Sequence, residues 1–212
     1  MTIIAVSRGT FIGGEALATS VADRLGCRCV SREVLLEAAW GYGVPVEKLD
    51  AAMEKRPPLW ERLIGKRTAH FTFVRAALCD QALAGPLVYH GYIGHLALPG
   101  ISHVLRVRAI ADMEYRIQAA MRHRGLSRKD AATFIERVDK ERRQWARSLF
   151  DVEWDDPALY DVVLNLSRMG LETATEMVVR LAEREEFQPT AASMKALRDL
   201  ALGNRVAATL AR

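Results

Sequence analysis

The stretch TIIAVSRGTFIGG, residues 2–14, contains the pattern that decides the fold. Its first six residues form a short apolar run rich in β-branched side chains, which predicts a buried strand. Glycines follow at positions 9, 13 and 14, and residues 15–25 then carry apolar side chains near helical spacing up to Gly26, a typical helix stop. The chain therefore begins with a strand, a glycine loop and a helix.

The glycine loop has the composition of a phosphate site. Glycines let a backbone curl and aim its N–H groups at phosphate oxygens, and the N-terminus of the following helix adds its positive dipole end. Gly9 and Gly14 have the spacing of the outer glycines in the phosphate-binding motif G-x-x-x-x-G-K-[ST]. The next two positions depart from it, since Glu15 replaces the lysine and Ala16 replaces the Mg²⁺-binding hydroxyl. On the loop alone, a nucleotide site and a tight turn without any ligand fit equally well.

Further short apolar runs alternate with helical stretches along the rest of the chain. We expect strands at 27–30, 87–89, 104–107 and 160–164, and helices from Ser31, at 68–83, 112–124, 127–150 and 171–186, and after Pro189. The prolines and glycines of residues 41–67 predict short helices on a mobile flank. This alternation predicts an α/β fold, a five-stranded parallel sheet flanked by helices on both faces, with ligands beyond the carboxyl ends of its strands.

Composition bounds the class of protein. The chain has 212 residues, half of them hydrophobic, which suits one full core. No apolar run approaches the roughly 20 residues of a membrane span, and no basic region precedes the first apolar run, so a cytoplasmic location without a membrane partner is expected. The net charge of +4, without a basic block at either end, suits an anionic small molecule and makes nucleic acid the less favoured partner.

The cysteines and histidines do not form a recognisable metal site. Cys27, Cys29 and Cys79 have no ligand partners at metal spacing and are expected to be core residues. The histidines at positions 90, 95 and 103 straddle predicted loops and strands without a carboxylate partner. No metal ligands are therefore assigned.

Three further stretches resemble a known family when they are taken in order. They are RAIADMEYRI at 108–117, VDKERRQWAR at 138–147 and WDDPALYDVVLN at 154–165. Together with Ser7-Arg8 and Gly13-Gly14, they resemble the cytidylate kinase-like family over residues 2–182. The resemblance implies a three-layer P-loop kinase-type domain at 1–187 with a helical, arginine-rich lid, followed by a helical C-terminal tail at 188–212. Its members include small kinases that transfer a phosphoryl group from ATP to a nucleoside monophosphate.

The predicted lid helix carries the charges that such chemistry needs. Asp139, Arg143 and Arg147 are spaced i, i+4, i+8 and share one helical face, while Arg142 lies about 100° round the helix from Arg143. Arginines can clamp a phosphoryl group bidentately without losing their charge. A solvated face with ion pairs within the helix is the alternative. The resemblance implies catalytic roles for Asp139, Arg142 and Arg147.

The resemblance also implies binding residues and cofactors. The donor nucleotide would contact Ser7, Arg8, Gly9, Gly13, Gly14, Glu15, Arg116, Arg122 and Arg124. The acceptor would contact Arg32, Gly91 and Tyr92, although relatives carry an arginine where this chain has Tyr92. ATP and Mg²⁺ are the implied cofactors, with Mg²⁺ held by water, phosphates and an acidic side chain because Ala16 cannot ligate it.

Two functions stay open at this point. One is an ATP-dependent nucleoside monophosphate kinase, and the other is a kinase-like module that binds a nucleotide without chemistry. Glu15, Ala16 and Tyr92 favour the second. Nucleic-acid binding through the arginine-rich helix is a weaker third idea, and the apolar tail after Pro189 is a candidate arm for a homodimer.

Overall fold

A computed structural model describes residues 2–31, 33–35, 66–91 and 94–210 of the chain, with only the backbone given for residues 66–70. Arg32 and Tyr92, two of the predicted acceptor contacts, lie outside these ranges. So do the short helices predicted within 41–65, and the helix predicted from Ser31 is described only over residues 33–35.

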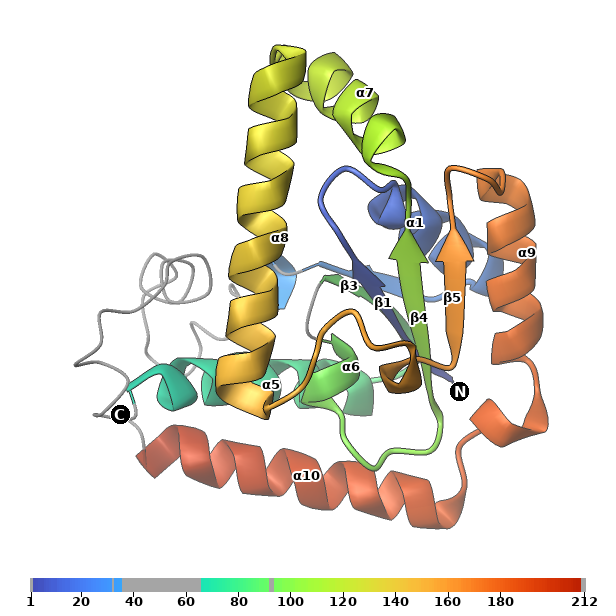
Figure 1. Cartoon of the computed structure of the whole chain (residues 1–212). Coiled ribbons are helices and arrows are strands. Elements are labelled where there is room, and N and C mark those ends of the chain that lie inside the picture. The colour runs from blue at the N-terminus through green and yellow to red at the C-terminus, as the bar shows by residue number, and fades with distance from the viewer. Residues whose placement is uncertain (1, 32, 36–65, 92–93, 211–212) are drawn as a thin grey trace.

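The core of the molecule is one sheet of five parallel strands, which confirms the predicted fold class. The strands are β1 (Ile3–Arg8), β2 (Arg28–Val30), β3 (Leu87–Gly91), β4 (Val104–Ile110) and β5 (Val162–Asn165). Their order across the sheet is β2-β3-β1-β4-β5. The chain leaves the central strand β1 towards one flank and later crosses to β4 on the other, so the carboxyl end of β1 lies at a topological switch point (Figure 1).

Helices cover both faces of the sheet and bury two separate apolar clusters. Ile4 and Val6 of β1 face helices α1 (Gly14–Leu25) and α9 (Leu171–Ala182), whereas Ile3 and Ala5 face the other side. On that side lie α5 (Lys66–Leu83), the short α6 (Gly94–Ala97) and α10 (Ala191–Leu210). The alternation of side chains along β1 thus produces a three-layer domain.

Two helices form the predicted lid. Helices α7 (Met113–Arg124) and α8 (Arg128–Phe150) extend beyond the carboxyl ends of the strands (Figure 1). Ile117 and Ala120 of α7 pack against Ala131 and Ile135 of α8 in a small cluster of their own. Ser127 caps α8 as predicted, because its side chain accepts a hydrogen bond from the Asp130 backbone N–H at 3.2 Å.

Several predicted boundaries need correction by a few residues, three of them for a clear physical reason. Strand β4 continues to Ile110, whereas the strand predicted from the apolar run ends at position 107. The prediction stopped at the charged residue Arg108, which is in fact buried and paired inside the strand. Strand β5 begins at Val162, not at position 160, and follows the 3₁₀ turn Pro157–Leu159. Helix α9 ends at Ala182, not at position 186, because side chains from outside the helix bind the Ala182 carbonyl oxygen, and the 3₁₀ turn Glu185–Phe187 follows.

The C-terminal tail is helical, as predicted. Helix α10 packs along α5, and Leu197, Ala201 and Ala208 belong to the same buried cluster as the α5 side chains (Figure 1). The boundary between a domain at 1–187 and a tail at 188–212 stays a prediction. Among the described helices, none is both long and apolar enough to cross a membrane.

Candidate nucleotide site

The glycine loop joins the carboxyl end of β1 to the N-terminus of α1 in a tight turn. Gly13 is the N-cap of α1 with φ 89°, a left-handed conformation that favours glycine. A Cβ on Gly9 would come within 2.5 Å of the Ile12 Cδ1, and one on Gly14 within 2.6 Å of the Arg8 Cβ. Because Gly13 has no side chain to cap the helix, the first N–H groups of α1 are left for a ligand or for water.

Phe11 anchors the loop to the lid. It has φ 57°, which is uncommon for a bulky residue, and its ring lies 6.0 Å from the ring of Phe134 on α8. The Arg124 guanidinium lies 4.9 Å from the Phe134 ring centroid. Arg124, a predicted donor contact, thus lies beside these two rings. Its side chain is exposed, as is that of Arg122, another predicted donor contact. Neither has a described contact with the glycines of the loop.

Arg116 of α7 fixes the path of the loop backbone. Its Nε donates to the Thr10 carbonyl oxygen at 2.9 Å, and its Nη2 donates to Asp139 Oδ2 of α8 at 2.6 Å. Arg116 and Asp139 are 8% and 7% exposed, so this is a buried ion pair. The second carboxylate oxygen of Asp139, Oδ1, is buried without a hydrogen-bond partner among the described residues. The pair joins the loop to both lid helices at one point.

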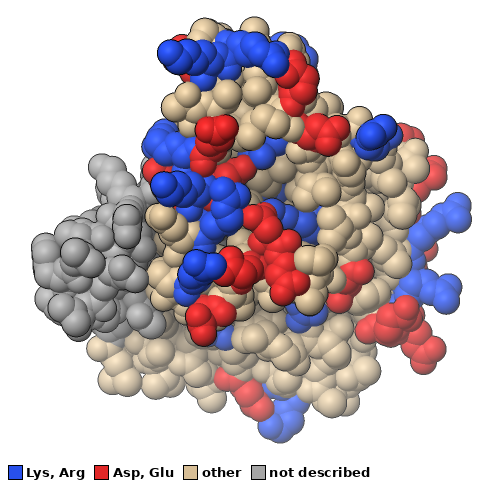
Figure 2. Space-filling view, in the orientation of Figure 1, with Lys and Arg blue, Asp and Glu red and all other residues tan. Residues whose placement is uncertain are grey.

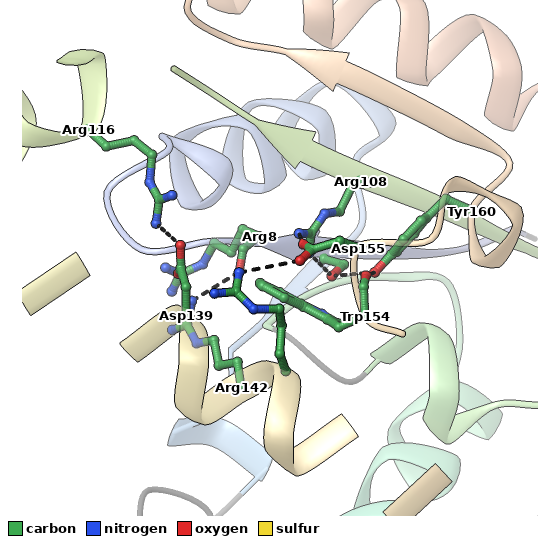
Figure 3. Close-up of polar contacts among 10 residues, drawn as sticks. Arg8, Arg108, Arg116, Asp139, Arg142, Trp154, Asp155 and Tyr160 are labelled. Atoms are coloured by element: carbon green, nitrogen blue, oxygen red, sulfur yellow. Dashed lines mark hydrogen bonds and ion pairs between the residues drawn. The ribbon is translucent and has the colours of Figure 1, made fainter. Parts of the chain in front are cut away.

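Arg142 of α8 also reaches the loop. Its Nη1 donates to the Arg8 carbonyl oxygen at 3.2 Å. The predicted residues Arg8, Arg116, Asp139 and Arg142 are thus brought together at the carboxyl end of β1 (Figure 3). The lid contributes cationic side chains to the place where the loop would hold phosphates.

A second polar cluster, which sequence reasoning missed, surrounds Arg108 of β4. The Arg108 guanidinium lies 3.6 Å from the centroid of the Trp154 ring and donates to Asp155 Oδ1 at 2.7 Å (Figure 3). It also donates to the Ser7 hydroxyl at 3.3 Å, and Tyr160 donates to the Trp154 carbonyl oxygen at 2.8 Å. Burial lowers the pKa of Arg108, while Tyr160 and Asp155 partly oppose that shift.

This cluster determines where Ser7 lies. Its hydroxyl is 1% exposed and faces Arg108 and the Tyr160 hydroxyl, behind the loop. Ser7, predicted as a donor contact, therefore supports the start of the loop from inside the protein. The signal that could have revealed the cluster is a charged residue inside an apolar strand, together with the Trp154-Asp155 dipeptide of the family stretch.

The outer part of the lid pairs with the segment that follows it. Arg143 Nη1 lies 3.4 Å from Asp155 Oδ2, and Arg147 forms an ion pair with Glu153. The Arg143 and Arg147 side chains are 46% and 68% exposed. Figure 2 shows basic side chains along α8 next to a group of acidic ones. Arg147, predicted to be catalytic, is thus held by a surface carboxylate and has no described contact with the loop.

The acceptor side of the site is described only in part. Gly91 ends β3, and a Cβ there would overlap the Tyr89 hydroxyl, so its glycine is required by packing. His90 and His95 are 5% and 4% exposed, and burial lowers the pKa of both, that of His95 to about 3. The ring of His95 lies 4.6 Å from that of Tyr160. These histidines are neutral core groups at neutral pH.

A small pocket of about 90 Å³ opens beside the loop on the β5 side. It is lined by Gly13, Ala16, Tyr115, Leu166, Met169 and Leu171. Its wall combines aliphatic side chains with one aromatic ring, that of Tyr115.

Few side chains that could bind a metal lie near the loop in the described part of the chain. Within the described ranges, no group of three or more His, Cys, Asp or Glu side chains could hold a metal ion. Cys27 and Cys29 are half-buried free thiols, and Cys79 is buried. Ala16 has no oxygen, and the nearest described carboxylate at the start of α1 is Glu15, which points to Arg8. The residues that the structure describes do not fit a protein-held Mg²⁺.

Comparison with known proteins identifies relatives of the whole domain. The sequence pattern of the cytidylate kinase-like family matches residues 3–168. A protein named cytidylate kinase from Ignicoccus hospitalis is 25% identical over 184 residues, which cover 85% of this chain and 99% of that protein.

One solved structure supports the same fold. The crystal structure of an uncharacterized protein from Eubacterium ventriosum matches with a TM-score of 0.66 and 21% sequence identity, covering 87% of this chain and all of that one. At this identity the likeness concerns the fold alone. The family match covers both the glycine loop and the lid, and the chain therefore belongs to the cytidylate kinase-like family.

Proposed function

We propose that this protein is a nucleoside monophosphate kinase that transfers a phosphoryl group from ATP to a nucleotide acceptor. The observation that carries the proposal is the contact of the lid with the loop, in which Arg142 Nη1 lies 3.2 Å from the Arg8 carbonyl oxygen. It brings a permanent cation to the edge of a loop built for phosphate. Cytidylate is the favoured acceptor because a relative that aligns with this chain over 99% of its own length is named cytidylate kinase.

The donor would bind along the glycine loop. The N–H groups at the start of α1 would receive the phosphates, and the pocket beside Tyr115 and Leu166 would receive the base. Arg116 donates a hydrogen bond to the Thr10 carbonyl oxygen, and this bond keeps that oxygen turned away from the bound phosphates. This arrangement gives phosphate a site of oriented donors with little reorganisation.

Transfer itself needs stabilisation of spreading negative charge. An oxygen of the acceptor's phosphate would form a bond to the terminal phosphorus of ATP, while the bond from that phosphorus to the bridging oxygen breaks and ADP leaves. Arg142 of α8 would stabilise this charge because it reaches the loop, and Arg147 would join it after leaving Glu153. Asp139, bonded to Arg116, acts as a positioning residue for the loop.

The metal of such a reaction would arrive with the nucleotide. ATP carries Mg²⁺ on its phosphates in water, and this chain supplies no Ser or Thr hydroxyl at position 16 to fix it. We therefore assign no step of the reaction to a protein-bound metal.

A second function is favoured by one specific observation. Glu15, 69% exposed at the start of α1, stands where the phosphate motif has lysine. A nucleotide-binding module without transfer would tolerate this loss of charge. It predicts stabilisation by ATP without formation of a product.

The test is ADP formation by the purified protein with ATP, Mg²⁺ and each nucleoside monophosphate in turn. We expect turnover with cytidylate, reduced about 100-fold in Arg142→Gln because a charge-assisted contact to the transferring group is lost. Arg137→Gln is the matched control, since Arg137 lies on the same helix and pairs with Glu141 at 3.4 Å. Binding of ATP without turnover on any acceptor would favour the second function.

A further inference from the structure

The missing lysine leaves the loop short of one positive charge. In the motif, that lysine brings its charge to the terminal phosphates of the nucleotide. Here Glu15 occupies its position, and a carboxylate there repels a nucleotide unless it is neutralised. A replacement must come from another residue near the start of α1.

Arg8 reaches that place from the end of β1. Its side chain runs over the first residue of the helix, since a Cβ on Gly14 would come within 2.6 Å of the Arg8 Cβ and 3.0 Å of its Cδ. The Arg8 Nη2 then lies 3.8 Å from Glu15 Oε2. Glycine at position 14 is thus required for the arginine to pass, and the guanidinium ends beside the residue that replaces the lysine.

Arg8 is paired with its carboxylate less closely than the neighbouring buried arginines are with theirs. Arg116 and Arg108 lie 2.6 Å and 2.7 Å from their carboxylate oxygens, whereas Arg8 is 3.8 Å from that of Glu15. Glu15 is also 69% exposed, so water screens its attraction. A phosphate with several charged oxygens can displace such a partner, because guanidinium binds phosphate bidentately.

Two further observations agree with this position. The Arg8 Nε is buried without a hydrogen-bond partner among the described residues, so the contact with Glu15 does not satisfy the whole guanidinium. Burial is the main cause that lowers the pKa of His90, and the positive charge of Arg8 is the second cause. The Arg8 guanidinium therefore lies near the carboxyl end of β3 as well as the start of α1, between the expected donor and acceptor sides.

We propose that Arg8 binds the donor phosphates in place of the missing lysine, and that Glu15 holds the Arg8 side chain over α1 until a phosphate displaces it. This inference rests on the proposed nucleotide site. It gives Glu15 a role that the phosphate motif alone does not explain.

The test measures dissociation constants for ATP and for inorganic tripolyphosphate by calorimetry. Arg8→Met keeps the aliphatic stem over Gly14 and removes the charge, and we expect both probes to bind about 10- to 100-fold more weakly. Arg24→Met is the matched control, because Arg24 lies in the last turn of α1, at the opposite end of the helix from the loop, and pairs with Glu172. It should bind both probes as the unmodified protein does.

Two variants of Glu15 complete the test. Glu15→Gln removes the repulsion and should tighten ATP binding about threefold, and Glu15→Lys added to Arg8→Met should recover most of the lost affinity. If Arg8→Met binds both probes like the unmodified protein, or if Glu15→Gln weakens binding, the inference is wrong while the proposed function stands. If the unmodified protein binds neither probe, the proposed function fails and the inference fails with it.

Discussion

Arginines occupy two contrasting regions of this protein, one beneath the glycine loop and one along the outer lid. Beneath the loop, the Arg108 and Arg116 side chains are 7% and 10% exposed and lie within 2.7 Å of a carboxylate oxygen. Along the lid, Arg143 and Arg147 are 46% and 68% exposed and pair with the segment that follows α8. The same residue type, with the same kind of partner, is thus placed in two different dielectric settings.

The difference indicates two separate tasks. A buried ion pair is costly to break, because removing one partner leaves an uncompensated charge away from water. An exposed pair contributes little and can exchange its carboxylate for another anion. We therefore infer that the buried arginines set the shape of the loop, and that the exposed arginines can exchange their carboxylates for a phosphate.

Breaking the buried pair should have the largest effect. Arg116→Met removes the bonds to Thr10 and Asp139 and leaves the Asp139 carboxylate buried and unpaired. We expect the free energy of unfolding to fall by about 3–5 kcal/mol, measured by urea denaturation.

A double variant and a surface control sharpen this prediction. Asp139→Leu added to Arg116→Met should recover part of the loss, because no lone charge is then buried. Arg128→Gln, which breaks the exposed pair with Glu114, should leave the midpoint nearly unchanged. Equal midpoints for Arg116→Met and Arg128→Gln would contradict the contrast between the two regions.

Acid should destabilise the protein through the buried region. Burial lowers the pKa of His95 to about 3, below the 6.5 of an exposed histidine. Between these two values the unfolded chain binds one more proton than the folded one, so stability falls as pH falls. This histidine alone should lower the free energy of unfolding by about 2 kcal/mol between pH 6.5 and pH 5.

His95→Phe should flatten that part of the pH profile of unfolding, because it removes the group that takes up the proton. Phenylalanine should be tolerated there, since both ring nitrogens of His95 are buried without a hydrogen-bond partner among the described residues. His123→Gln, on the exposed end of α7, is the matched control and should keep the native profile. A His95→Phe profile as steep as that of the native protein would show that another group is responsible.

The smallest effect on stability is expected at the lid surface. Arg147→Gln and Glu153→Gln break an exposed pair and should each shift the melting temperature by no more than about 2 °C. Their effects on turnover should differ in sign, because Glu153→Gln releases Arg147 whereas Arg147→Gln removes it. Kinetics with ATP and cytidylate would reveal this, and equal changes in both variants would argue against an exchangeable lid arginine.

Local pattern predicted the elements of the fold well. The strand, glycine loop and helix of residues 2–25 follow from side-chain periodicity and from glycines, both of which act over a few residues. Ser127 was identified as the cap of α8 for the same reason. The family resemblance added the lid, which lies where it was expected.

Long-range pairing was the part that could not be predicted. The predicted strand ends before Arg108 because a charged residue interrupts the apolar run. Its partner Asp155, which allows it to be buried in the strand, lies 47 residues away along the chain. The lid face of Asp139, Arg143 and Arg147 follows from helical spacing, but its partners come from α7 and from the segment after α8. Which arginine meets the loop therefore depends on packing that no local pattern encodes.

The nucleotide site is tested most directly by titrating ¹⁵N-labelled protein with ATP and following the amide resonances in NMR spectra. A nucleotide site at the glycine loop predicts that the largest shifts belong to residues 9–16 and to residues 166–171, which border the pocket. The amides of α10, on the opposite side of the sheet from α1, should stay unchanged. Shifts confined to α10 or to the outer lid, with the loop amides unmoved, would contradict a nucleotide site at the glycine loop.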